Sequence, residues 1–187
     1  MADEHVEVMV VRRSVPLRSM VDLARAEGWN LLIDSPRMHT SVSTLEWDVG
    51  TGRVGWYEEH EFGVRRIKIH GADEVRPLVR ARIECEDRAD LVALASGGAT
   101  PQSLDALRAL ALLEARHPSA ELLDLLRRWL GSPNVNVRRA LLHVLRIGFY
   151  ELIDDVERLA REDAPLAVRW SKLHEAMRRR MQPARPL

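Results

Sequence analysis

The segment LEWDVGTGRVGWY, residues 45–57, decides the fold of the first half of the chain. Apolar residues at positions 45, 47 and 49 alternate with acidic residues at 46 and 48, which is the pattern of a strand with one buried face. The glycines at positions 50 and 52 supply a tight turn, and the alternation resumes at Val54 and Trp56. The segment therefore predicts a β-hairpin, and with it a sheet.

The patterns around this hairpin complete a small α+β domain. Period-two alternation predicts a strand over Val6–Val10, and a short apolar run predicts another over Trp29–Ile33. A further strand is expected around residues 67–69, in what reads as an antiparallel meander. Apolar stripes at helical spacing predict helices near residues 17–24 and 74–83. The predicted order is β-α-β-β-β-α, with the helices packed on one face of the sheet.

A cluster of helix breakers from Gly97 to Pro101 separates this region from a continuously helical one. We therefore predict an α+β domain over residues 1–98 and a helical domain with a short basic tail over residues 99–187. Apolar residues recur at helical spacing in five stretches after the breakers: residues 104–111, 122–130, 137–145, 152–160 and 166–177. The breaks between them are short, so neighbouring helices are expected to form antiparallel hairpins.

Self-similarity is the strongest signal in the helical half. The run SPNVNVRRAL, residues 132–141, has a second copy in APLAVR, residues 164–169. On these motifs, residues 101–181 resemble the HEAT-repeat family of short α-solenoids. The resemblance implies helical hairpins that bury their apolar faces against one another, and a binding scaffold whose ligand it does not specify. The N-terminal half carries no resemblance that we recognise.

The composition excludes several classes of protein. The 187-residue chain carries 28 Lys and Arg against 28 Asp and Glu, so its net charge gives no global argument for binding nucleic acid or a membrane. No apolar run is long enough to span a bilayer, and the N-terminus is acidic where a secretory signal would be basic. Cys85 is the single cysteine, which excludes a disulfide framework and suits a reducing compartment. We expect a cytoplasmic protein without membrane contact.

Three patterns with the residue types of chemical sites lack the context that such sites need. The run GTGRVG, residues 50–55, matches the GxGxxG pattern of dinucleotide sites, but no helix is predicted after it. The acidic run EEHE, residues 58–61, together with His39, His70 and Cys85, has ligand chemistry without the spacing of a metal site. Cys85 beside an apolar helix is typical of a small core residue. We expect no catalytic residue, cofactor or metal.

Aromatic residues crowd the hairpin at Trp47, Trp56 and Tyr57. At least one of these rings must face outward if the strand alternates, and an exposed aromatic ring is a natural anchor for a protein partner. The alternative is that both faces of the sheet are covered. The three residues are therefore candidate contact residues.

Three arginines of the helical half, Arg108, Arg138 and Arg169, are expected at equivalent places in successive repeats. Aligned along one face, their guanidinium groups would bind an acidic partner or phosphates. In the family that this half resembles, such arginines commonly form salt bridges between repeats instead. Both interpretations stay open at the level of the sequence.

The repeat predicts a non-enzymatic protein-binding adaptor or an inhibitor, for example an immunity protein for a toxin. The alternatives are a nucleic-acid-binding protein that uses the arginine face, and an enzyme that uses Glu58, His60 and Glu61 or binds a small ligand in the helical half. The sequence does not identify the partner, and a dimer is compatible with it.

Overall fold

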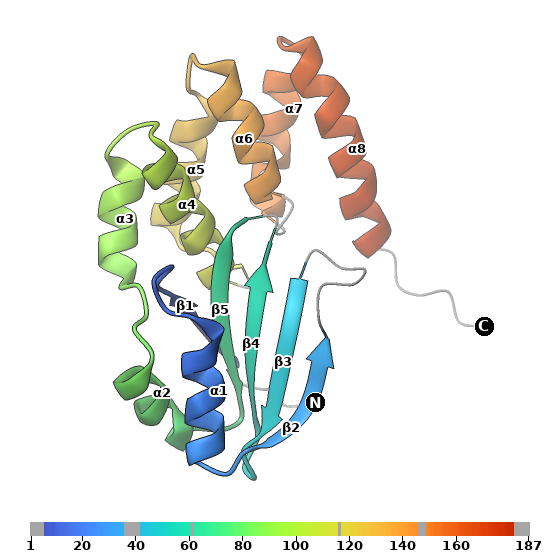
Figure 1. Cartoon of the computed structure of the whole chain (residues 1–187). Helices are drawn as coiled ribbons and strands as arrows, with labels where there is room; N and C mark the ends of the chain where they lie inside the picture. Colours follow the sequence, from blue (N-terminus) through green and yellow to red (C-terminus); the bar gives the residue numbers. More distant parts are fainter. Residues whose placement is uncertain (1–5, 36–41, 61, 116, 146–148, 182–187) are drawn as a thin grey trace, which may run out of the picture. The chain divides into compact units, whose positions relative to one another are not determined.

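The computed structural model describes residues 6–35, 42–60, 62–115, 117–145 and 149–181 (Figure 1). It divides between Leu91 and Val92 into two compact units. The division lies inside helix α3 (Arg88–Ser96), upstream of the glycine cluster at which the sequence predicts a boundary. The last turn of α3 belongs to the second unit, since the indole N–H of Trp129 donates to the carbonyl oxygen of Ala95 at 3.1 Å.

The first unit is built on one five-stranded antiparallel sheet with the strand order β1-β5-β4-β3-β2. Its strands are β1 (Val6–Val11), β2 (Asn30–Ser35), β3 (Val42–Asp48), β4 (Arg53–Glu59) and β5 (Val64–His70). The α+β class and the antiparallel meander are confirmed. The predicted order contains one strand too few, because the central hairpin contributes two strands, β3 and β4, in addition to the other three.

The hairpin register fixes which side chains share a face. Trp47 lies opposite Val54, and Leu45 lies opposite Trp56. Because side chains alternate along each strand, these four residues point to the same side of the sheet. The turn that sets this register contains Gly50, whose φ of +87° is a conformation that glycine adopts without strain.

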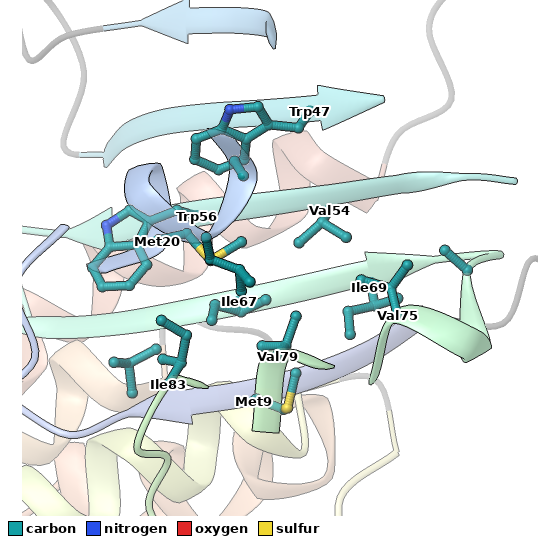
Figure 2. Close-up of a cluster of buried hydrophobic side chains, with 14 of the residues drawn as sticks. Met9, Met20, Trp47, Val54, Trp56, Ile67, Ile69, Val75, Val79 and Ile83 are labelled. Atoms are coloured by element: carbon teal, nitrogen blue, oxygen red, sulfur yellow. The ribbon is translucent and has the colours of Figure 1, made fainter. Parts of the chain in front are cut away.

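Helices α1 (Leu17–Ala26) and α2 (Arg76–Arg82) cover this face, and η1 (Asp73–Val75) leads into α2. Figure 2 shows the resulting core, in which Trp47 and Trp56 lie near Met20 of α1 and strand residues such as Ile67. Val79 of α2 is fully buried in the same cluster. The prediction that helices pack on one face of the sheet is therefore confirmed.

The second unit consists of helices among the residues that the structure describes. After the last turn of α3 come α4 (Pro101–Leu113), α5 (Ala120–Leu130), α6 (Val135–Leu145), η2 (Tyr150–Leu152), α7 (Ile153–Ala160) and α8 (Ala164–Met181). The five predicted helical stretches are confirmed as α4 to α8. Packing joins α4 to α5 and α6, α5 to α6 and α7, and α8 to α6 and α7. Within the described part of the chain, no helix has the length and apolarity needed to cross a membrane.

The close approach of Gly52 to the end of β5 gives a test of the hairpin. A Cβ at this position would overlap the backbone carbonyl oxygen of His70. Because backbone cannot move aside without breaking strand pairing, we expect Gly52→Ala to lower the free energy of unfolding by about 1–3 kcal/mol. Urea denaturation followed by circular dichroism measures this.

Gly131→Ala is the matched control for Gly52→Ala. A Cβ on Gly131, after α5, would meet its nearest atom at 3.5 Å, an ordinary contact. We expect its effect to stay within about 0.5 kcal/mol. Equal effects of the two substitutions would contradict the hairpin geometry.

Candidate protein-binding surfaces

Two of the three aromatic candidates are core residues, which corrects their prediction as contact residues. Trp47 and Trp56 are only 4% and 1% exposed. The hairpin register sends both rings to the face that α1 and α2 cover, where they form part of the hydrophobic core (Figure 2). Their contribution is to folding, since burial of rings this large is among the main sources of core stability.

Tyr57 lies on the opposite face of the sheet and is half-buried. Its hydroxyl donates a hydrogen bond to the carboxylate of Glu46 on β3. The Lys68 ammonium and the Arg66 guanidinium lie 4.7 Å and 5.5 Å from the centre of its ring, within the range of cation–π attraction. A Cβ on Gly55 would lie 2.6 Å from Tyr57 Cε2, so the glycine leaves the space that the ring occupies.

The Tyr57 hydroxyl is a hydrogen-bond donor rather than a proton carrier. Burial, reinforced by the hydrogen bond to Glu46 and by its charge, raises the pKa of Tyr57 well above the usual value. The hydroxyl therefore stays protonated at neutral pH. Arg66 also forms an ion pair with Glu59 of β4, so the residues around the ring hold one another in place.

Arg138 stabilises the helical unit from within. Its guanidinium donates to the carbonyl oxygen of Ser132 at 2.6 Å and to the carboxylate of Asp163 at 3.0 Å. Asp163 in turn accepts the backbone N–H of Leu166 in the first turn of α8. This hydrogen bond and the guanidinium hold the pKa of Asp163 below its usual value. Arg138 thus links α6 to the start of α8, as in the salt-bridge interpretation of these arginines.

The other two arginines differ from Arg138 and from each other. Arg108 forms an ion pair with Asp105 one turn earlier on α4, at 3.0 Å, and its side chain is 21% exposed. Arg169 is exposed on α8, next to Val168, which is 60% exposed. The three guanidinium groups therefore differ in their surroundings, because two of them form ion pairs within the protein and Arg169 is exposed.

The exposed apolar side chains of the sheet lie on β2. Leu31, Leu32 and Ile33 are 52%, 51% and 41% exposed, and all six residues of the strand are exposed. The register with β3 shifts between Leu31 and Ile33, which leaves Leu32 as the extra residue of a β-bulge. Three consecutive large apolar side chains therefore face solvent around the bulge.

The β2 strand is also an edge strand of the sheet. It pairs with β3 on one side, and no other strand of the described chain follows it. We call the side of β2 that faces away from β3 the open edge. A strand at such an edge presents unpaired backbone N–H and C=O groups, which form a template for another strand.

The chain itself covers one end of the opposite edge of the same sheet. The N–H of Arg12 donates to Glu84 at 3.0 Å, and the N–H of Glu86 donates to Val10 at 2.8 Å. Val11 and Cys85 form a single antiparallel bridge between these two hydrogen bonds. The segment after α2 thus pairs with the end of β1, and the open edge of β2 differs from this paired stretch in both backbone pairing and exposure.

Sequence reasoning missed the open edge, because the apolar run Trp29–Ile33 reads as a buried strand. A usable signal was present. An antiparallel sheet with helices on one face buries every second residue of a strand, so three consecutive apolar residues cannot all be buried. The three consecutive apolar residues Leu31, Leu32 and Ile33 therefore indicated that part of the strand is exposed.

The carboxylates considered for metal chemistry have other partners. Glu58 pairs with Arg65 at 3.1 Å, and Glu59 pairs with Arg66. His60 shares a hydrogen bond of 2.7 Å with the hydroxyl of Ser43. Within the described residues, no three His, Cys, Asp or Glu side chains are grouped so as to hold a metal ion. His39 and Glu61 lie outside the described residues.

The surroundings of the GxGxxG run and of Cys85 fit structural roles. The GxGxxG run occupies the β3–β4 turn and the first half of β4, with no helix after it, so the glycines serve a hairpin. Burial raises the pKa of the Cys85 thiol, which disfavours the nucleophilic thiolate.

Comparison with known proteins adds no family to this description. No family model matches the chain, and neither the curated proteins nor the solved structures give a match. The HEAT resemblance of residues 101–181 therefore stays a prediction from the sequence.

The position of Arg138 predicts a structural role that Arg169 lacks. We expect Arg138→Ala to lower the free energy of unfolding by about 1.5–3 kcal/mol, the usual contribution of hydrogen bonds to a charged group. Exposed Arg169→Ala should change it by less than about 0.5 kcal/mol. Urea denaturation of both variants measures the difference, and similar values for the two would show that Arg138 does not link α6 to α8.

Proposed function

We propose that the chain is a non-enzymatic, cytoplasmic protein-binding adaptor or inhibitor, and that the open edge of β2 holds an extended segment of its partner. The observation that supports this most strongly is the exposure of Leu31, Leu32 and Ile33 on an edge strand. Exposed apolar edge strands promote aggregation, and proteins commonly cover or charge them. Within the described residues, the chain pairs the end of β1 with the segment after α2 and leaves the apolar strand β2 exposed.

Strand addition uses both chemical features of the open edge. The outward backbone groups of β2 form main-chain hydrogen bonds with an added strand, and these supply affinity without dependence on sequence. The apolar side chains at positions 31–33 add burial of hydrocarbon surface, which selects apolar partner residues. A folded sheet needs little rearrangement to accept a strand, so most of the ordering cost falls on the incoming segment.

The helical unit fits the proposal as a rigid scaffold. We propose that it is a short HEAT-like array, on the recurrence of the motifs at residues 132–141 and 164–169. The hydrogen bonds of Arg138 between Ser132 and Asp163 join the two copies of the motif. Val168, exposed on the last helix, gives this unit an apolar contact of its own.

The nucleic-acid alternative has less support from the geometry. Phosphate binding needs several cations free to replace counterions. Arg108 and Arg138 each form an ion pair within the protein, so Arg169 alone of the three candidates is exposed.

The test of the proposed function is the double substitution Leu31→Thr and Leu32→Thr. Threonine keeps the strand preference while it removes most of the apolar surface. We expect partner affinity to fall about tenfold or more, because roughly 1.4 kcal/mol of binding free energy corresponds to a factor of ten. Tagged wild-type protein captures the partner from host lysate, and calorimetry with the purified partner gives the affinities.

Leu94→Gln is the matched control, because Leu94 on α3 is 50% exposed, almost the same as Leu32. It should leave partner affinity unchanged. All variants should keep the wild-type unfolding midpoint, since they are at exposed positions. Equal affinity of wild type and the double variant, or loss of binding in Leu94→Gln as well, would contradict strand capture at β2.

A further inference from the structure

Carboxylates surround the open edge. Asp34 lies on β2 itself, and Glu27 lies in the turn that leads into the strand. Glu46 and Asp48 lie on β3, opposite Ile33 and Asn30. No lysine or arginine occurs among the described residues of this region, 26–35 and 42–52. The edge therefore carries acidic groups near both ends of its apolar centre.

Two arginines of the described residues lie beside this region, and each has a carboxylate as its neighbour. Arg25 at the end of α1 lies 3.8 Å from the carboxylate of Asp22 on the same helix. Arg53 lies opposite Asp48 on β4, on the side of β3 away from β2. Asp48 itself accepts the N–H of Gly50 in the turn, so its charge is partly engaged there.

The cations of β5 are farther from the open edge. Arg66 and Lys68 lie by the ring of Tyr57, and β4 and β3 separate their strand from β2. Neighbouring strands are about 4.8 Å apart, so the β5 backbone lies about 14 Å from β2. The Lys68 and Arg66 side chains lie beside Tyr57, which donates to Glu46, so they partly offset the charge of Glu46. The negative charge of the edge is therefore only partly offset, with Asp34 and Glu27 its most exposed members.

We infer that the open edge selects an extended apolar segment flanked by lysine or arginine at both ends. This inference rests on the proposed strand capture and adds the chemistry of the partner. The part of the partner segment that pairs with the edge is expected to match the six residues of β2 in length. Apolar residues at its centre would cover Leu31, Leu32 and Ile33, while basic flanks would meet Glu27 and Asp34.

The charges also argue against a second copy of this chain as the occupant. Two β2 strands paired about a two-fold axis would bring two acidic edges together, and like charges across strands are destabilising. The bulge at Leu32 would meet its own copy in the same pairing, which interrupts the ladder of hydrogen bonds.

The probes are two synthetic peptides of eight residues that share a central Val-Ile-Val-Ile run. One carries two lysines at each end, and the other carries two glutamates at each end. We expect the basic peptide to bind the full-length protein about tenfold more tightly at 50 mM NaCl, measured by fluorescence anisotropy. The ratio should approach one at 0.5 M NaCl, because salt screens exposed charges.

Charge variants of the protein locate the effect. We expect Glu27→Gln together with Asp34→Asn to reduce the preference for the basic peptide to about threefold or less. Glu162→Gln removes an exposed carboxylate of the helical unit and should leave the ratio unchanged. The double variant Leu31→Thr and Leu32→Thr should weaken both peptides alike.

Each other outcome decides between the inference and the function on which it rests. If both peptides bind the wild-type protein with equal affinity and neither binds the threonine variant, the charge preference is overturned and strand capture is kept. If neither peptide binds, strand capture of a linear segment is overturned. A dimer in sedimentation that the threonine variant dissociates would show that a second copy occupies the edge, and would overturn the inference.

Discussion

The pairing register of β3 with β4 is the constraint on which the rest of the first unit depends. It places Trp47 and Trp56 on the same face of the sheet, where α1 and α2 bury them. A shift of β3 by one residue would turn Trp47 to the other face and bury Glu46 and Asp48 in its place. The Gly50 turn and the tight approach of Gly52 to His70 hold the register. The same register sends Tyr57 to the other face, where its hydroxyl donates a hydrogen bond to Glu46.

A sheet with this order has two edges, and the chain treats them differently. The residues after α2 pair with the end of β1 and cover that part of one edge. At the other edge, a bulge exposes Leu31, Leu32 and Ile33 together. Exposed hydrocarbon at an edge carries a cost in solubility, so its presence beside acidic groups fits a surface with a ligand. Strand capture accounts for the exposed backbone, the apolar centre and the acidic flanks with one partner.

The sequence predicted most of the fold, because local patterns carry it. Alternation at residues 45–57 gave the hairpin, and helical spacing gave α4 to α8. The candidate residues fared worse, because a side chain's role depends on contacts far away in sequence. The recurrence of Arg138 was visible, but its bond to Asp163 required the packing of α6 with α8. The covered end of β1 depends on pairing with residues 84–86, which no local pattern of the sequence indicates.

Hydrogen exchange of the backbone amides of residues 30–35, followed by NMR, tests the central claim most directly. An open edge predicts that the amides of β2 that point away from β3 exchange rapidly in the free protein, while the amide of Arg12, which donates to Glu84 at the opposite edge, exchanges slowly. Binding of the partner or of the basic peptide should lower the exchange rates of these β2 amides at least tenfold. Slow exchange of all β2 amides in the free protein, or no change on binding, would contradict the account of β2 as the site of strand capture.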